Sequence, residues 1–267
     1  MQKTILITGA TDGIGLATAK MLAAKGHHLL IHGRNSGKLN NVVKMLSALP
    51  NADRIERYVA DLSVLSEVAA LAKAVTGQHN KLDVLINNAG VFKVDNKTTA
   101  DGLDVRFVVN TIAPYLLTKS LMRLLGSAGR VINLSSAAQA PVNIEALLGN
   151  TELPDIQAYA QSKLAITMWT HSMALSSNVT GPVMIAVNPG SMLGSKMVQE
   201  GFGVPGGDIN IGAEILTEVA LEDEFCKASG KYFDNDSGHF ATPHADVTNA
   251  QKAKELIAAM ERLLVPF

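Results

Sequence analysis

The sequence predicts a single α/β domain in which a doubly wound, seven-stranded parallel sheet carries helices on both faces. Two observations predict this fold class. Short aliphatic runs alternate with segments of helical periodicity along the whole 267-residue chain, which is typical of repeated βα units. Most of these runs are apolar throughout, which indicates strands buried on both faces, as in a parallel sheet. No Pro-rich or Ser-rich linker interrupts the alternation, so we expect residues 1–267 to form one domain.

The predicted strands are short and regularly spaced. They are Thr4–Thr8, His28–His32, Arg57–Ala60, Val84–Asn87, Arg130–Leu134, Val183–Asn188 and Lys231–Phe233. The predicted helices lie between and after them, at about Ile14–Lys25, Gly37–Leu49, Leu65–Thr76, Ala100–Leu125, Ile156–Ser177, Ala213–Phe225 and Ala250–Leu264. Gly26 is a typical stop signal for the first helix, and Asp61 with Ser63 is a typical start signal for the third.

One segment breaks the regular alternation. Residues 190–212 contain several glycines together with Met192, Met197 and Phe202. A long glycine-rich segment with apolar side chains is typical of a loop that closes over a binding site. We therefore expect this segment to form a mobile apolar lid.

Charge and composition narrow the range of partners. The chain has 23 basic and 24 acidic residues, so nothing indicates electrostatic binding to nucleic acid or to anionic lipid. No apolar run approaches the roughly 20 residues that a membrane span needs. Strand-like residues begin at Thr4, which leaves no room for a targeting segment. We expect a soluble cytoplasmic protein that acts on a small molecule.

The sequence does not indicate a metal site. The single cysteine, Cys226, excludes both an intrachain disulfide and a cysteine-based zinc site. One interpretation of His239 and His244, with the aspartates near them, is a metal-binding loop. We favour a solvated C-terminal segment near the mouth of the substrate site, because the histidines show no metal-binding pattern. We therefore expect no metal cofactor.

A glycine-rich turn follows the first predicted strand and precedes the first helix, with the sequence Thr8-Gly9-Ala10-Thr11-Asp12-Gly13-Ile14-Gly15. Glycines in such a turn let the backbone approach a pyrophosphate, whose negative charge is stabilised at the helix N-terminus. A purely structural turn uses the same residues, but the position between a strand and a helix favours a dinucleotide site. The candidate contacts in the turn are Gly9, Thr11, Asp12, Gly13, Ile14 and Gly15.

Three motifs, taken in order along the chain, resemble the short-chain dehydrogenase/reductase family. They are the Gly-x3-Gly-x-Gly spacing of the turn, Asn87-Asn88-Ala89-Gly90 after the fourth strand, and Tyr159-x3-Lys163. The resemblance covers the whole chain and implies a Rossmann fold that binds NAD(H) or NADP(H). It also implies further cofactor contacts: Asn88, Ala89 and Gly90 at the adenosine ribose, Asp61 and Leu62 at the adenine, and Pro189 and Gly190, with Met192, at the nicotinamide.

The end of the second predicted strand indicates which dinucleotide is bound. An acidic residue there would bind the ribose 2′-hydroxyl and repel a 2′-phosphate. This chain instead has Arg34 and Asn35, with Lys38 nearby, and an arginine can bind a phosphate through two parallel hydrogen bonds. Two points oppose this interpretation: Arg34 could be a solvated surface charge, and NADP-preferring relatives often have a basic residue in the glycine loop, where this chain has Asp12. We predict NADP(H) rather than NAD(H).

Tyr159 and Lys163 form the centre of the predicted catalytic site. They are four residues apart at the start of a predicted helix, so their side chains lie on the same side of it. A phenol has an unperturbed pKa of about 10, and we expect a neighbouring ammonium and a cationic nicotinamide to lower the pKa of Tyr159. Tyr159 is then the acid/base, and Lys163 also holds the nicotinamide ribose.

Ser136 and Asn110 complete the predicted site. By resemblance, the second serine of the pair Ser135-Ser136 polarises the substrate carbonyl, and Asn110 relays protons through water. Pro114 follows Asn110 by four residues and has no N–H. We therefore expect the Asn110 carbonyl to lose its helical partner, the helix to kink, and the freed carbonyl to bind the relay water. A role of Pro114 in packing alone is the alternative.

The interval before Tyr159 is long. Tyr159 follows Ser136 by 23 residues, roughly ten more than is usual in the family. We expect the added stretch, residues 141–155, to form an excursion beside the substrate. This long interval, and the sequence Ser229-Gly230-Lys231-Tyr232-Phe233 near the end of the chain, resemble the retinol dehydrogenase-like and protochlorophyllide reductase-like branches of the family.

The sequence therefore predicts an NADP(H)-dependent oxidoreductase that transfers a hydride between nicotinamide and a carbonyl or alcohol of a small, apolar substrate. The alternatives are a carbon–carbon double-bond reductase on the same scaffold and a non-catalytic NADP(H)-binding sensor. The four candidate catalytic residues argue against the sensor. The resemblance also suggests a homodimer or homotetramer, in which the outer sides of the helices over 100–125 and 156–177 pair between subunits.

Overall fold

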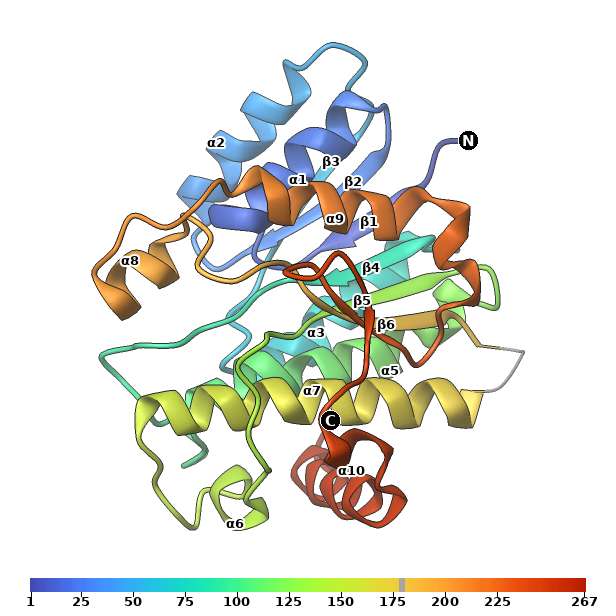
Figure 1. Cartoon of the computed structure of the whole chain (residues 1–267). Coiled ribbons are helices and arrows are strands. Elements are labelled where there is room, and N and C mark those ends of the chain that lie inside the picture. The colour runs from blue at the N-terminus through green and yellow to red at the C-terminus, as the bar shows by residue number, and fades with distance from the viewer. Residues whose placement is uncertain (178–180) are drawn as a thin grey trace.

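Eight strands form one sheet in the computed structural model, in the order β3-β2-β1-β4-β5-β6-β7-β8 (Figure 1). The structure describes residues 1–177 and 181–267. The strands are β1 (Thr4–Ile7), β2 (His28–Gly33), β3 (Ile55–Val59), β4 (Val84–Asn87), β5 (Arg130–Leu134), β6 (Val183–Asn188), β7 (Tyr232–Asp234) and β8 (His239–Ala241). The first seven are parallel. The strand order reverses between β1 and β4, and ligands of such sheets bind at the carboxyl ends of the strands beside this reversal.

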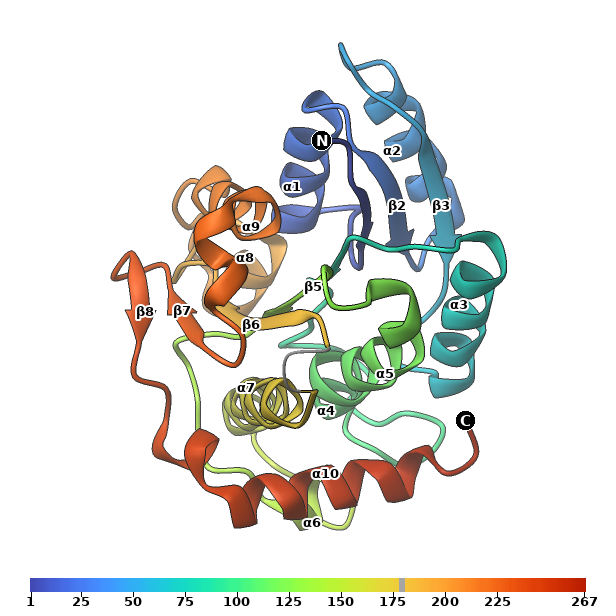
Figure 2. The same ribbon diagram turned by 90° about the vertical axis from the view of Figure 1, so that its right-hand side faces the viewer.

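Helices cover both faces of the sheet (Figure 2). One face carries α1 (Gly13–Ala24), α2 (Ser36–Ser47) and α9 (Asn210–Leu221), and the other carries α3 (Leu65–Gln78), α5 (Ala113–Leu125) and α7 (Asp155–Ser177). The shorter elements are α4 (Val105–Phe107), the π-helical segment η1 (Val108–Ile112), α6 (Ile144–Leu147), α8 (Lys196–Phe202), and the 3-10 helices η3 (Asp223–Lys227) and η4 (Ala245–Thr248). The last helix is α10 (Ala250–Leu264).

Each face of the sheet has its own hydrophobic core. In β1, Leu6 belongs to the core under α3, α5 and α7, whereas Ile5 and Ile7 belong to the core under α1, α2 and α9. All three side chains are fully buried. Because successive residues of a strand point to opposite faces, a strand covered on both sides must be apolar throughout. This packing explains the sequence pattern, and the predicted doubly wound fold is confirmed.

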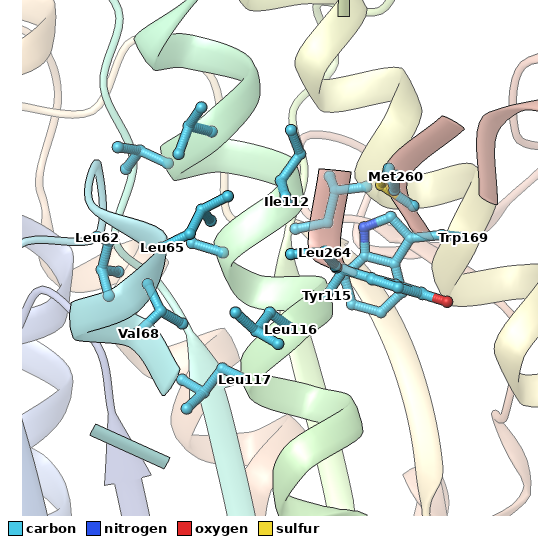
Figure 3. Packing of buried hydrophobic residues seen from close by; sticks show 14 of the residues in the cluster. Leu62, Leu65, Val68, Ile112, Tyr115, Leu116, Leu117, Trp169, Met260 and Leu264 are labelled. Carbon is cyan, nitrogen blue, oxygen red and sulfur yellow. The ribbon is translucent and has the colours of Figure 1, made fainter. Parts of the chain in front are cut away.

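α10 lies outside α5 and α7 and does not touch the sheet (Figure 2). Its residues Met260 and Leu264 share a core with Tyr115 of α5 and Trp169 of α7 (Figure 3). Glu261 of α10 also accepts a hydrogen bond from Tyr115 Oη at 2.5 Å. Trp169 is completely buried by these contacts. α10 therefore covers part of the outer surface of α5 and α7.

The prediction of seven strands is wrong by one. Residues 234–238 form a tight turn after β7, in which Gly238 has a φ of 73°. The chain then returns as β8, which pairs with β7 in the antiparallel direction. β8 has three residues, and His239 and Phe240 are exposed. So short a strand at the edge of a sheet shows no periodicity by which it could be recognised.

The helix predicted over Ala100–Leu125 is wrong in its first part. Gly102, with a φ of 79°, lies in a turn, and the helix begins only at Val105, after Asp104. Its hydrogen bonding then changes to the π type over Val108–Ile112, with Asn110 at the centre. Pro114 cannot donate to the Asn110 carbonyl, so the expected interruption of the α-helix is present at this point.

The expected lid is more regular than its glycine content suggests. The helix predicted over Ala213–Phe225 begins already at Asn210 and ends at Leu221. Within residues 190–209 the chain forms α8, whose first turn is capped by Ser195 through a hydrogen bond from the Val198 N–H at 3.3 Å. A capping serine before Lys196–Phe202 was the available signal for this helix.

The excursion over residues 141–155 packs on the outside of α7. It contains α6, which Figure 1 shows beyond α7, on the side away from the sheet. Ala146 and Leu147 of α6 are buried in the same core as α7 and α10. Burial of these apolar side chains stabilises the excursion in this position.

A buried ion cluster connects the two helical segments that carry candidate catalytic residues. Arg106, with 1% of its surface exposed, lies four residues before Asn110, and Asp155 lies four residues before Tyr159. Arg106 Nη1 is 2.5 Å from Asp155 Oδ1, and Arg106 Nη2 is 2.6 Å from Asp104 Oδ2. The guanidinium therefore fixes the start of α7 relative to α4 and η1.

Replacing Arg106 with methionine would leave Asp104 and Asp155 without their shared partner. We expect the free energy of unfolding to fall by about 3 kcal/mol, the usual consequence of breaking a buried ion pair from one side, as measured by urea denaturation. Lys119→Met, which breaks the exposed pair with Glu261, should cost less than about 1 kcal/mol. Equal losses in the two variants would contradict the role assigned to Arg106.

Candidate active site

The glycine turn between β1 and α1 lies against the segment that follows β4. Asn88 Nδ2 donates to the carbonyls of Thr8 and Gly9, at 2.8 and 3.1 Å. A Cβ on Gly9 would come within 2.9 Å of Ala89 Cα, and one on Gly15 within 2.3 Å of Asn88 Nδ2. Neither position has room for a side chain, so the two segments approach through their backbones.

α1 begins at this turn, and its first N–H group already has an anionic partner. Asp12 Oδ1 accepts the Gly13 N–H at 2.7 Å and so caps the helix. The atoms closest to a Cβ on Gly13 would be side-chain atoms of Ile209 and Ser195, both at 3.9 Å. The backbone at Gly13 therefore has open space on the side that faces residues 190–212. A phosphate that binds this N–H must displace the Asp12 carboxylate, because both anions use the same donor.

A buried histidine joins the glycine turn to the end of β3. His32 has 1% of its surface exposed. Its Nδ1 accepts the Gly9 N–H at 3.3 Å, and its Nε2 lies 3.0 Å from the Ala60 carbonyl oxygen. Both contacts are satisfied only by the neutral ring with its hydrogen on Nε2. Burial lowers the pKa of His32, which favours this neutral form.

The residues predicted to bind adenosine lie at the ends of β2 and β3. Arg34 is exposed, and in the described part of the chain no ion pair occupies its guanidinium. Asn35 caps α2 through a hydrogen bond from a backbone N–H at 2.9 Å. Asp61 accepts hydrogen bonds from the backbone N–H and the hydroxyl of Ser63. Leu62 is 5% exposed, so its side chain is part of the core and only its backbone can meet a ligand.

Thr11 and Ile14, the other predicted contacts in the turn, lie on opposite sides of it. A Cβ on Gly33 would come within 2.6 Å of Thr11 Cγ2, and one on Gly212 within 3.3 Å of Ile14 Cδ1. Thr11 thus packs on the end of β2, and Ile14 packs on α9. A dinucleotide laid along the carboxyl edge of the sheet would fit this arrangement. The glycine turn allows a close approach, the N-terminus of α1 can bind a phosphate that displaces the Asp12 carboxylate, and Arg34 has no ionic partner in the described chain.

Tyr159 and Ser136 meet at the same edge, at the end of β5. The Ser136 side chain is close enough to the Tyr159 hydroxyl to lower the pKa of Tyr159. Ser136 Oγ also accepts the Ala138 N–H at 3.1 Å. The neighbouring Ser135 is buried, and its hydroxyl lies 2.6 Å from Thr167 Oγ1. The structure therefore places Ser136, rather than Ser135, beside the Tyr159 hydroxyl.

Lys163 lies beside Tyr159 and is buried. Its Nζ donates to the Leu134 carbonyl at 2.7 Å and is 5.7 Å from the centroid of the Tyr159 ring. A Cβ on Gly90 would come within 3.5 Å of Lys163 Nζ and 3.4 Å of Asn110 Oδ1, so Gly90 lies directly beside both residues. Burial lowers the pKa of Lys163 to about 8.

The pKa of Tyr159 is shifted in the direction opposite to the sequence-based expectation. Burial raises it, and the hydrogen bond with Ser136 opposes this with a smaller effect. The effect of burial outweighs the expected decrease, and Lys163 Nζ lies 5.7 Å from the centroid of the Tyr159 ring. In the protein alone, the phenol is therefore protonated at neutral pH.

The Asn110 side chain is fully occupied within the fold. Its Nδ2 donates to the Val91 carbonyl and to Ser162 Oγ, both at 2.9 Å, and its Oδ1 accepts the Val91 N–H at 2.8 Å. Asn110 is 1% exposed. The backbone carbonyl of Asn110 cannot accept a hydrogen bond from Pro114, which has no N–H.

The loop after β6 forms the opposite wall of the site. It contains Pro189, Gly190 and Met192, the residues predicted to lie at the nicotinamide. Gly190 has a φ of 124° and Met192 a φ of 53°. A positive φ is unfavourable for methionine, so neighbouring contacts must hold it. The Gly207 N–H provides one of them, because it donates to the Met192 carbonyl at 2.8 Å.

An aromatic stack joins Tyr159 to the lid, and the sequence analysis missed its central member. Phe92 lies 5.1 Å from the Tyr159 ring and 5.5 Å from the Phe202 ring, centroid to centroid. Phe202 is 51% exposed, and Met192 and Val204 of the same segment are also exposed. Phe92 comes two residues after Gly90, and this position beside a predicted cofactor contact was the signal that could have identified it.

The structure thus gathers the candidate residues into two groups on one edge of the sheet. Gly9–Gly15, Arg34, Asn35, Asp61 and Leu62 lie at the ends of β1, β2 and β3. The predicted catalytic residues lie beside the ends of β4 and β5: Ser136 follows β5, Lys163 of α7 binds the Leu134 carbonyl, and Asn110 of η1 binds Val91 after β4. Asn88, Ala89 and Gly90 lie between the two groups, because Asn88 binds the glycine turn and Gly90 adjoins Lys163.

Two remaining expectations from the sequence concern metal binding and membrane-spanning helices. Within residues 1–177 and 181–267, no three His, Cys, Asp or Glu side chains are arranged to hold a metal ion. His239 lies 3.2 Å from the Ser237 hydroxyl, and His244 Nδ1 accepts the Asp246 N–H at 3.1 Å. Among the helices of these same residues, none has the length and apolar character to cross a bilayer.

Known proteins similar to this chain have the same kind of fold. The family profile described as "short chain dehydrogenase" matches residues 3–202. Human retinol dehydrogenase 13 is 30% identical over 98% of this chain and 84% of that protein, which confirms the expected resemblance to retinol dehydrogenases. The chloroplastic short-chain dehydrogenase TIC 32 A of Brassica napus is 32% identical over 86% of this chain and 79% of its own. A solved metagenomic short-chain oxidoreductase in complex with NADP is 27% identical, with a TM-score of 0.63, over 82% of this chain and 90% of its own.

Replacing His32 with glutamine keeps an acceptor for the Gly9 N–H and a donor for the Ala60 carbonyl but removes the ionisable ring. The pKa of His32 is lower in the folded state than its value of about 6.5 in the unfolded chain, so the unfolded state takes up the proton first as the pH falls. We expect urea denaturation to show a larger loss of stability between about pH 7 and pH 5 in the wild type than in H32Q. His239→Gln controls for the loss of an exposed histidine. Identical pH dependence in the wild type and H32Q would contradict this assignment.

Proposed function

The chain belongs to the short-chain dehydrogenase family, and from this premise we propose that it is an NADP(H)-dependent oxidoreductase that acts on a carbonyl or alcohol with Tyr159 as the acid/base. The observation that carries the proposal is the geometry at the end of β5. A protonated tyrosine, a serine hydroxyl and a buried ammonium converge on one place, beside an edge that fits a dinucleotide. When bound, the cofactor supplies or accepts a hydride at the nicotinamide ring.

The protein residues orient the substrate and move its proton. In the reducing direction, the substrate oxygen accepts hydrogen bonds from the hydroxyls of Ser136 and Tyr159, and Tyr159 then donates its proton to that oxygen. Burial raises the pKa of Tyr159, which keeps the proton available at neutral pH.

Lys163 and Asn110 restore the proton. One N–H of the Lys163 ammonium is bound to the Leu134 carbonyl, and the others face Tyr159 and the cofactor side. With a pKa lowered by burial to about 8, Lys163 gives up a proton more easily than an exposed lysine does. In this proposal the backbone carbonyl of Asn110, to which Pro114 cannot donate, holds the water through which the proton is exchanged with solvent.

The NADP(H) preference is supported by Arg34. It is exposed at the end of β2 without an ionic partner in the described chain, at the place where a carboxylate would otherwise bind the ribose. A similar solved structure was obtained in complex with NADP. Asp12 opposes this preference only in part, because a helix-capping carboxylate on a flexible side chain can turn away from a phosphate.

The substrate class is supported by the aromatic stack and the lid. A carbonyl oxygen bound at Tyr159 places the rest of the substrate near Phe92 and Phe202, whose rings form a continuous apolar surface. Met192 adds an adaptable apolar side chain. One similar protein is named retinol dehydrogenase 13, and this name agrees with an apolar alcohol or aldehyde as the substrate. We propose flat or extended apolar carbonyl compounds as substrates.

Replacing Tyr159 with phenylalanine keeps the ring contact with Phe92 and removes the proton donor. We expect kcat to fall by a factor of about 100 or more, while the dissociation constant for NADPH changes by less than about twofold. Turnover is measured as loss of NADPH absorbance with apolar aldehydes and ketones, and binding as NADPH fluorescence. Tyr58→Phe, which removes a hydroxyl at the far edge of the sheet, is the matched control. Full turnover by Y159F would overturn the proposed role.

Replacing Arg34 with alanine tests the choice of cofactor. We expect the affinity for NADPH to fall by about tenfold, as for the loss of a charge-assisted contact, with little change in the affinity for NADH. Lys44→Ala, an exposed charge on α2, controls for a general electrostatic effect. A wild type that prefers NADH, or an R34A variant that binds NADPH as tightly as the wild type, would refute the NADP(H) assignment.

A further inference from the structure

The turn between β7 and β8 is bound to the loop after β6 by side-chain hydrogen bonds. Asn188, the last residue of β6, is 2% exposed. Its Nδ2 donates to Asp234 Oδ1 at 2.7 Å and to Asp236 Oδ2 at 2.8 Å. Asp236 also accepts the backbone N–H of Ser191 at 2.7 Å and the Ser191 hydroxyl. One carboxylate thus holds both ends of the segment from Asn188 to Ser191.

The backbone of the turn strengthens this attachment. The Asn235 N–H donates to the Asn188 carbonyl at 3.1 Å, and Asn235 Nδ2 donates to the Pro189 carbonyl at 3.0 Å. Gly190 and Met192, both with positive φ, lie inside or directly after the bound segment. A backbone in these unfavourable conformations persists only where its surroundings fix it, and the turn supplies those contacts.

The strand before the turn reaches the other side of the site. Tyr232 of β7 is 7% exposed, and its Oη donates to the Ser136 carbonyl at 3.2 Å. Burial raises the pKa of Tyr232, so the hydroxyl keeps the proton that it donates. Gln139 Nε2 donates to the same carbonyl at 2.9 Å. The position of Ser136 is therefore also fixed from β7.

The hairpin itself is anchored by aromatic packing. Phe233 of β7 and Phe240 of β8 have ring centroids 5.2 Å apart, in an edge-to-face arrangement. Both rings contact Phe225 of η3, at 5.7 and 5.8 Å. Such pairs contribute beyond the burial of their area, and they give two strands of three residues each a fixed position. A short hairpin without this support would be only marginally stable.

We propose that the β7–β8 hairpin is a positioning element, in which Asp236 holds the loop after β6 and Tyr232 holds Ser136, so that the two sides of the site keep a fixed separation around Tyr159. The inference rests on the proposed function, because these two loops face the nicotinamide and the substrate only if that function is correct. The hairpin lies beyond the segment matched by the family profile, residues 3–202.

The carboxylates of the turn do not suit the alternative of a cation site. Three of the donors around Asp234 and Asp236 are the side-chain N–H groups of Asn188 and the hydroxyl of Ser191. These hydrogens point at the oxygen atoms that would have to bind a cation. Hydrogen bonds from Ser191 and Asn188 lower the pKa of Asp236, although burial alone would raise it. The carboxylate is therefore ionised and matched to its donors.

The experiment compares two ligands in an Asp236→Ala variant of the full chain. NADPH reaches both ends of the site, whereas adenosine 2′,5′-bisphosphate reaches only the end near Arg34. We expect the dissociation constant for NADPH to rise by about tenfold and that for the bisphosphate to change by less than about twofold, because one charge-assisted contact is lost at one end only. In D236N, which keeps one acceptor oxygen, the dissociation constant for NADPH should lie between the values of the wild type and of D236A. Asp246→Ala removes a carboxylate that pairs with Lys252 beside α7 and α10, and it is the matched control.

Tyr232→Phe provides the second measurement. It should lower kcat by about three- to tenfold, the usual effect of one neutral hydrogen bond, and shift the pH profile of kcat, because Ser136 moves relative to Tyr159. The dissociation constant for NADPH should stay unchanged. Tyr58→Phe is the control.

The outcomes separate this inference from the proposed function. Equal weakening of both ligands in D236A would indicate a general structural defect and overturn the positioning role. Unchanged NADPH binding in D236A, with unchanged kcat in Y232F, would overturn it as well. A wild-type chain that binds no NADPH would overturn the proposed function and this inference together.

Discussion

A row of buried hydrogen bonds between the end of β5 and α7, here called the polar seam, is the constraint on which the whole candidate site depends. Side chains one turn apart on α7 bind consecutive residues at the end of this strand: Thr170 binds Asn133 at 2.7 Å, Thr167 binds Ser135 at 2.6 Å, and Lys163 binds the Leu134 carbonyl at 2.7 Å. These groups are buried, so an unmade hydrogen bond would cost the full desolvation of its partner. The helix therefore has one favourable register on the sheet. Tyr159, one turn before Lys163, is placed at the carboxyl edge as a result.

The other parts of the site are held to this seam by separate means. Arg106 ties the segment that carries Asn110 to the start of α7, and the β7–β8 hairpin holds the loops on either side of Tyr159. Within residues 190–212, Phe202 is half exposed on the aromatic stack. An exposed aromatic ring beside polar groups that are held in place suits the binding of an apolar substrate under the proposed function.

The sequence was informative where structure is determined locally. β4, β5 and β6 begin and end at the predicted residues, because burial on both faces makes each of them a mostly apolar run. The glycine turn and the spacing of Tyr159 and Lys163 were equally visible, since each lies within a few neighbouring residues. Features that depend on contacts between distant parts of the chain could not be predicted from the sequence. β8, the covering of α5 and α7 by α10, the contact of Asp236 with Ser191 and the raised pKa of Tyr159 all arise from residues that only the fold brings together.

The central claim is that a carbonyl carbon at Tyr159 receives the hydride of the nicotinamide, and isotope transfer tests it most directly. The measurement uses NADPH carrying deuterium at the transferable position of nicotinamide C4 and cinnamaldehyde, an apolar aldehyde that also has a conjugated double bond, with the product analysed by mass spectrometry and NMR. The account predicts cinnamyl alcohol with one deuterium on its carbinol carbon. Deuterium on the β-carbon would show double-bond reduction, and a product without deuterium would show that no hydride passes from the cofactor. Either result would contradict the account.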